Sequence, residues 1–142
     1  MKFLTSVFLL LVVMACNPED ATPITAPNSP DAALDFADAT VVKGGMFVGI
    51  GGHTASGTVT LYELSGKKYI VFDPYSSQNG PDLKVYLSKD ATATEYIRVG
   101  VLMGVMGRQV YEIPGNPDLT QYPFVHIWCE QFSVEFARAA LM

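Results

Sequence analysis

Short runs of β-branched and aromatic residues, separated by Gly, Pro, Asn and Ser, make up the chain after Thr40. No window there keeps apolar residues at the 3.6-residue period of a helix for three turns, whereas several runs alternate with the period of two that is typical of a strand. The pattern predicts seven strands, at residues 57–64, 68–72, 83–88, 96–99, 108–113, 125–129 and 132–137. The glycine-dense stretch 44–52 is interpreted as a flexible lead into the first strand.

Seven short strands joined by tight turns predict an all-β fold, an antiparallel two-sheet β-sandwich that covers residues 41–142. The link at residues 65–67 is expected to close a hairpin between the first two strands. Where the alternation is clear, one set of side chains is expected to face the core, while Lys84, Tyr86 and Ser88 are expected to face water. The inward set is Leu83, Val85, Leu87, Phe132, Val134 and Phe136.

The amino-terminal segment has a different pattern, in which Lys2 precedes a mostly apolar run at residues 3–15. As a helix this run would extend about 20 Å, which is short of the roughly 30 Å of a bilayer core. A basic residue, an apolar run and a small residue at Ala15 are the layout of a secretory signal peptide. The ending Val13-Met14-Ala15-Cys16 also resembles the lipobox of bacterial lipoproteins.

We therefore expect residues 1–15 to be a lipoprotein signal peptide and Cys16 to be acylated, so that membrane lipid is a partner of the mature chain. Residues 16–40 are rich in Pro, Ala, Asp and Thr and are expected to form a lipidated spacer. The predicted location is the cell envelope, outside the cytoplasm, on the periplasmic face or the outer surface. An ordinary cleavage site that leaves Cys16 as a free thiol is the alternative.

The net charge and the number of cysteines exclude several classes of protein. The formal net charge is −5, and loss of a leader that contains Lys2 makes it −6, from fourteen acidic and eight basic residues. This sign is wrong for a nucleic-acid partner. Two cysteines, Cys16 and Cys129, are too few for a disulfide-stapled mini-protein or a four-cysteine zinc site, and we predict no metal site.

Cys129 is the remaining thiol if Cys16 is acylated. In a strand it shares a face with Val125 and Ile127, which is typical of a buried and inert cysteine. An unpaired thiol outside the cytoplasm is nevertheless open to oxidation, so Cys129 is also the candidate reactive residue. His126, three positions away, points to the opposite face of the strand, which disfavours a local metal site formed with Cys129.

Four segments carry a family resemblance: His53-Thr54-Ala55-Ser56-Gly57-Thr58-Val59, Val71-Phe72-Asp73, Gly80-Pro81-Asp82-Leu83-Lys84-Val85-Tyr86-Leu87 and Ile127-Trp128-Cys129-Glu130-Gln131-Phe132. Together they resemble the DM-thirteen domain, the Skeletor-type electron-transfer family, over residues 44–141. The resemblance implies a β-rich extracytoplasmic module, often found near DOMON-like haem domains, whose cysteine is proposed to act as a redox thiol or as a ligand to a prosthetic group. That role falls on Cys129, with haem as a candidate cofactor and His53 as the nominated neighbour of the sulfur.

Two functions remain open at this point. The first is a membrane-anchored redox accessory that uses Cys129, rather than a stand-alone enzyme. The second is a non-enzymatic binding module in which Cys129 is structural, and the loops at residues 75–79 and 115–118 face an envelope protein or a glycan.

Overall fold

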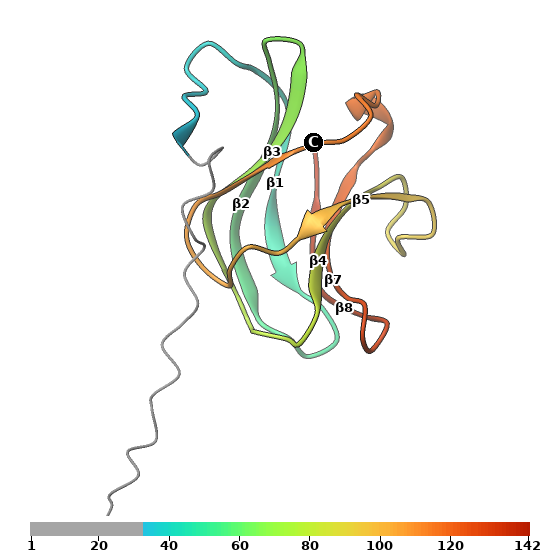
Figure 1. The fold of residues 1–142 in the computed structure, drawn as a ribbon. Helices are drawn as coiled ribbons and strands as arrows, with labels where there is room; N and C mark the ends of the chain where they lie inside the picture. The colour runs from blue at the N-terminus through green and yellow to red at the C-terminus, as the bar shows by residue number, and fades with distance from the viewer. Residues whose placement is uncertain (1–32) are drawn as a thin grey trace, which may run out of the picture.

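The computed structural model describes residues 33–142 of the chain, which form a β-structure with short connecting turns (Figure 1). The predicted signal peptide, Cys16 and most of the predicted spacer lie outside the described residues. No helix in the described part is long and apolar enough to cross a membrane. The elements are β1 (Thr40–Gly49), β2 (Ala55–Leu64), β3 (Lys67–Ser77), β4 (Leu83–Ser88), β5 (Tyr96–Val101), β6 (Gln109–Glu112), the 3-10 turn η2 (Leu119–Gln121), β7 (Phe124–Cys129) and β8 (Val134–Ala140).

The strands follow the order β5-β4-β7-β8-β1-β2-β3-β6, and every neighbouring pair is antiparallel. Strand β1 belongs to both halves, because its residues 40–46 pair with β2 and its residues 47–49 pair with β8. The first sheet is thus β1-β2-β3-β6, the second is β1-β8-β7-β4-β5, and the shared strand makes the whole nearly closed and barrel-like. The prediction of an all-β antiparallel fold is confirmed.

The core lies between the two sheets and joins side chains from nearly every strand. The inward positions predicted on β4 are correct, since Leu83, Val85 and Leu87 are all buried in this cluster. Its fully buried large side chains include Phe72, Leu61, Ile70, Leu87, Leu119 and Ile127. The hairpin β2–β3 turns through Ser65 and Gly66, both with positive φ, so the predicted link is one residue tighter than expected.

The interpretation of residues 44–52 as a flexible lead is wrong over most of its length, because β1 continues to Gly49. Its glycines allow close approach of neighbouring backbone. A Cβ atom at Gly45 would lie 2.2 Å from the carbonyl oxygen of Ala140, and one at Gly49 would lie 1.9 Å from that of His53. The absence of a side chain is therefore what lets β1 pack tightly at these two positions.

The predicted inward set on the last strand is correct only for Phe136, which is 6% exposed. Phe132 is 61% exposed and Val134 is 39% exposed, so both expectations are wrong. Ser133 adopts φ 53° in the turn that precedes β8, and the register between β7 and β8 shifts next to Trp128. This irregularity breaks the period-two alternation from which the three positions were predicted.

The outward set predicted on β4 does alternate with the core residues, but it does not face water. Lys84, Tyr86 and Ser88 are 7%, 4% and 0% exposed. Strand β4 lies between β5 and β7, whose outer side chains cover it, and the chain that leaves β4 bonds back to Ser88 through Asp90. The outer face of the second sheet is therefore a second packed layer rather than a solvated surface.

Candidate functional site

This packed outer face of the second sheet, called the outer layer below, gathers polar and aromatic side chains that have specific partners. It draws residues from four adjacent strands and from the turn after β7. Its members are Lys84, Tyr86 and Ser88 of β4, Tyr96 and Arg98 of β5, His126 and Trp128 of β7, Glu135 and Arg138 of β8, and Glu130. Two distinct arrangements make up the layer.

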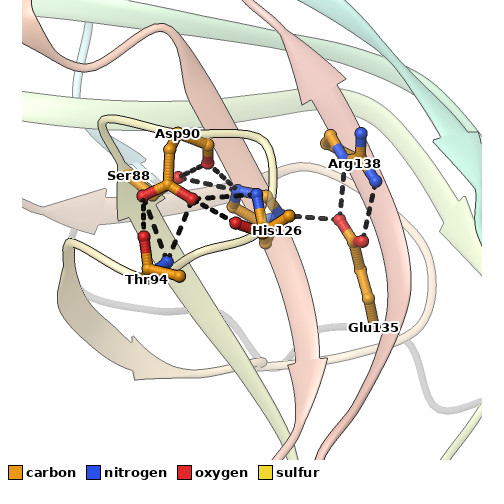
Figure 2. A network of polar contacts seen from close by, with 7 residues as sticks. Ser88, Asp90, Thr94, His126, Glu135 and Arg138 are labelled. Atoms are coloured by element: carbon orange, nitrogen blue, oxygen red, sulfur yellow. Dashed lines mark hydrogen bonds and ion pairs between the residues drawn. The ribbon is translucent and has the colours of Figure 1, made fainter.

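The first arrangement is a polar chain that crosses three strands (Figure 2). Ser88 Oγ lies 2.7 Å from His126 Nε2, and His126 Nδ1 lies 2.6 Å from Glu135 Oε1. Arg138 completes the chain by donating from Nε and Nη2 to the two oxygens of Glu135, each at 2.9 Å. Burial alone would raise the pKa of Glu135, but hydrogen bonds from Arg138 and His126 outweigh it and hold that pKa below its ordinary value.

The order serine, histidine, carboxylate is that of a hydrolase triad, but both Ser88 and His126 are fully buried. The Ser88 hydroxyl lies within hydrogen-bond distance of two partners, the carbonyl oxygen of Asp90 at 2.6 Å and His126 Nε2 at 2.7 Å. A hydroxyl enclosed in this way has no open side on which a substrate could approach it. The chain ties β4, β7 and β8 together, and its geometry gives no support to a nucleophilic serine.

The loop at residues 89–95, which leads from β4 to β5, is held in place by one carboxylate. Asp90 accepts hydrogen bonds from the backbone N–H groups of Thr92, Thr94 and Glu95 and from the hydroxyls of both threonines (Figure 2). These bonds, the Thr92 hydroxyl first among them, hold the pKa of Asp90 far below its ordinary value. The backbone of Asp90 is thereby fixed where its carbonyl oxygen meets Ser88.

The second arrangement is a stack of three rings across β5, β4 and β7, called the aromatic ladder below. The ring centroids of Tyr96 and Tyr86 are 4.1 Å apart with planes at 15°, and those of Tyr86 and Trp128 are 6.1 Å apart with planes at 17°. Tyr96 stands on the edge strand and is 45% exposed, whereas Tyr86 is 4% exposed. The ladder therefore runs from the protein surface into the middle of the second sheet.

A charged pair holds the central rung of the ladder. The Tyr86 hydroxyl donates to Glu130 Oε1 at 2.8 Å, and Arg98 Nε donates to the same oxygen at 2.6 Å. Burial, followed by the Glu130 carboxylate, raises the pKa of Tyr86 well above its ordinary value. The Arg98 guanidinium, followed by Tyr86, lowers the pKa of Glu130. Tyr86 is thus a neutral phenol whose proton already points at an ionised carboxylate.

Cys129 lies on the other side of β7, next in sequence to the last rung of the ladder. Its side chain is 0% exposed and belongs to the core with Val125 and Ile127, the two residues that share its face. It forms no disulfide in the described part of the chain. The cleft of about 230 Å³ between residues 79–84 and 101–105 is lined by neither Cys129 nor His53.

His53 lies in the connection between β1 and β2, where Phe136 and Gln78 are its partners. Its ring stacks on that of Phe136 with centroids 3.7 Å apart and planes at 10°, and Nδ1 lies 3.2 Å from Gln78 Oε1. These contacts do not include Cys129, so the nominated histidine and cysteine form no ring contact or hydrogen bond with each other. His126, the other histidine, faces the outer layer from the same strand as Cys129.

A haem group does not fit Cys129 in this fold. A thiolate ligand must offer its sulfur to the iron across an open face, and the Cys129 side chain is completely enclosed by core residues. Within residues 33–142, no group of three or more His, Cys, Asp or Glu side chains is placed to hold a metal ion.

The fold and the outer layer define a small antiparallel β module with a packed polar and aromatic outer face. A model of the family described as "Electron transfer DM13" matches residues 47–141, so the chain belongs to the DM-thirteen electron-transfer family. No curated protein and no solved structure matches it. The family resemblance on which the sequence prediction rested is confirmed.

Sequence reasoning missed the outer layer because the alternation along β4 was interpreted as core against water. A signal was present in the side chains themselves. Tyr86, His126 and Trp128 are large and carry aromatic rings, and large rings at the outward positions of adjacent central strands are expected to cover one another.

Proposed function

We propose that the protein is an electron-transfer accessory module, held on the outer side of a membrane by an acylated Cys16. The observation that carries this proposal is the family match over residues 47–141, which covers the whole sheet except the first part of β1. The predicted signal peptide and lipobox at residues 1–16 support the anchor. The module transfers electrons for a partner in the cell envelope instead of catalysing a reaction alone.

The anchor is tested by membrane fractionation and intact mass. Cys16→Ser is expected to move the protein from the membrane to the soluble fraction and to remove the mass of the acyl groups, since buried acyl chains supply the binding free energy. Cys129→Ala is the matched control, because it removes the other cysteine and is expected to leave both readings unchanged. Membrane retention of a Cys16→Ser protein whose mass shows that residues 1–15 have been removed and that no acyl group is present refutes the anchor.

Burial limits what Cys129 does within this function. Thiol–disulfide exchange requires a thiolate to approach a partner sulfur directly, and the folded protein gives no such approach to Cys129. We therefore expect no reaction of Cys129 with a thiol reagent in the folded state and full reaction after unfolding in urea. The absorption spectrum of the protein purified with its membrane is the companion measurement, because a Soret band would reveal haem.

A second candidate function is a binding module that presents its loops to an envelope protein or a glycan. A colourless protein with a closed thiol is the result expected here, and it excludes Cys129 as the redox centre without excluding electron transfer through other side chains. The burial of Cys129 is the observation that favours the binding module. A Soret band that disappears in Cys129→Ser, or a thiol that reacts in the folded state, restores the cysteine as the redox centre and refutes its assignment to packing.

A further inference from the structure

We infer that the aromatic ladder Tyr96–Tyr86–Trp128 is a relay for single electrons, with Tyr86 as its proton-coupled redox group and Glu130 as the proton acceptor. The inference rests on the proposed electron-transfer function and names the path by which electrons leave and return. A one-electron oxidant, such as an oxidised metal centre of a redox partner, is the reactant that the relay meets at Tyr96.

Stacked rings are the first observation behind the relay. Electron transfer between side chains is fast when π-systems are close and nearly parallel, and the two steps of the ladder have centroid separations of 4.1 and 6.1 Å. The rungs sit on the three adjacent strands β5, β4 and β7, whose backbone pairing holds the spacing. Of the two tyrosines in the ladder, only Tyr96, on the edge strand, is substantially open to solvent.

The same stacking argues against a sugar platform on this surface. A sugar ring packs on the open face of an aromatic ring, but the faces of Tyr86 are occupied by Tyr96 on one side and Trp128 on the other. Only 4% of Tyr86 is exposed. The geometry therefore favours contact between rings over contact with a ligand.

The proton acceptor is the second, independent observation. Oxidation of a phenol releases a strongly acidic proton, so an oxidised tyrosine needs a base within hydrogen-bond distance. Tyr86 has one in Glu130, at 2.8 Å, and Arg98 keeps that carboxylate ionised before the reaction. The interior rings Phe47, Phe72 and Tyr111 also lie close together, but the Tyr111 hydroxyl donates to the amide oxygen of Gln109, which is not a base at neutral pH.

The step balances in charge and atoms. One electron leaves Tyr86 through Tyr96 to the oxidant, which is reduced by one unit. The phenolic O–H bond breaks, and its proton moves along the hydrogen bond to Glu130 Oε1, so that a neutral tyrosyl radical faces a neutral carboxylic acid. A one-electron reductant supplies an electron that passes through Trp128 and returns Tyr86 to the phenolate level, and the proton moves back from Glu130.

Flash oxidation of the purified full-length protein tests the relay. A photogenerated ruthenium(III) polypyridyl complex serves as the oxidant, and transient absorption with electron paramagnetic resonance detects the tyrosyl radical. We expect Tyr86→Phe to remove most of the radical signal although six of the seven tyrosines remain. Tyr62→Phe is the matched control, because the Tyr62 ring packs against Phe36 outside the ladder, tilted by 38°, and forms no hydrogen bond to a carboxylate within residues 33–142.

Two further variants separate the relay from a merely structural role. Glu130→Gln keeps the shape of the side chain but removes the base, so radical formation is expected to slow by about tenfold or more. In the wild type, where the proton moves with the electron, we expect the rate of radical formation to be lower in heavy water than in ordinary water, and this difference is expected to disappear in Glu130→Gln. Tyr96→Phe alters the exposed rung without opening the sheet and is expected to lower the rate while Tyr86 still forms the radical. Circular dichroism confirms that each variant is folded.

Three results would each refute the relay. They are a wild-type radical yield in folded Tyr86→Phe, an equal loss of radical yield in Tyr62→Phe, and a rate of radical formation unchanged by Glu130→Gln. These outcomes leave the thiol and spectral tests of the proposed function untouched. Conversely, a thiol that reacts in the folded state, or a Soret band that depends on Cys129, would move the redox centre to the cysteine without changing the photochemistry of the ladder, so the two failures are distinguishable.

Discussion

Two phenylalanines near the carboxyl end of the chain provide a test of the register of β8. Phe136 and Phe132 both alternate with polar residues in the sequence, but the structure buries the first and exposes the second. We expect Phe136→Ala to lower the free energy of unfolding by about 3–5 kcal/mol, and Phe132→Ala to lower it by less than about 1 kcal/mol. The chemical change is identical, so the difference reports position alone.

The magnitude follows from burial. A buried phenylalanine removes about 150–250 Å² of surface from water, which at about 25 cal/mol per Å² gives roughly 4–6 kcal/mol for the whole side chain. Phe136 is 6% exposed, so nearly all of this is realised, and its ring also fills the space beside Gly80 and Leu83 and stacks on His53. Alanine at position 136 keeps part of the free energy gained by burying the side chain, but it leaves a cavity where the ring was. Phe132, at 61% exposed, leaves none.

Equilibrium unfolding in urea measures both variants, and the fluorescence of Trp128, the single tryptophan, reports the transition. If the slope of the free energy of unfolding against urea concentration is unchanged, the denatured state is unaffected, and the shift in the midpoint of unfolding is a shift in stability. Equal losses in the two variants, or a larger loss for Phe132→Ala, would show that β8 is in another register and that the bulge next to Trp128 is absent.

Two other outcomes are expected. Gly57→Ala should lower the free energy of unfolding by more than about 2 kcal/mol, because Gly57 has φ 113° and an added Cβ would lie 2.1 Å from the carbonyl oxygen of Pro74. Urea unfolding checks this, with Gly100→Ala as control, since a Cβ added there would meet no atom within 4 Å. The pKa of Glu135 is held below its ordinary value, so its contribution to stability is present at neutral pH and is lost as pH falls through that depressed pKa. Between about pH 6 and pH 3, stability should therefore fall more steeply in the wild type than in Glu135→Gln, and parallel curves would contradict the assignment.

The sequence predicted correctly the buried positions of strands in which apolar and other side chains alternate regularly. Leu83, Val85 and Leu87 follow a regular period of two and lie where expected. Strand β1 was missed because its glycines have low strand propensity, and what fixes them as strand is the backbone of Ala140 and His53, which only the folded chain brings near. The start of β8 was misplaced because a bulge is invisible to a period-two pattern.

The candidate site was harder to predict for the same physical reason. Cys129 and its core-facing neighbours follow from the local pattern, but the partners of His126 and Tyr86 come from strands far away in sequence. Glu135 and Glu130 read as ordinary surface acids until the pairing of β7 with β4 and β8 places them. Contacts of this kind depend on register between strands, and register is a property of the whole sheet.

The position of β8 bears on how the chain reaches its folded state. This strand, residues 134–140, lies between β7 and β1, so the last of the described strands joins the two halves of the sheet. Before it emerges, β1 and β7 each have one edge without a partner, and the contacts that complete the core span most of the domain. Such non-local pairing is slow to form. The core of a chain with this topology is therefore incomplete until β8 takes its place between β7 and β1.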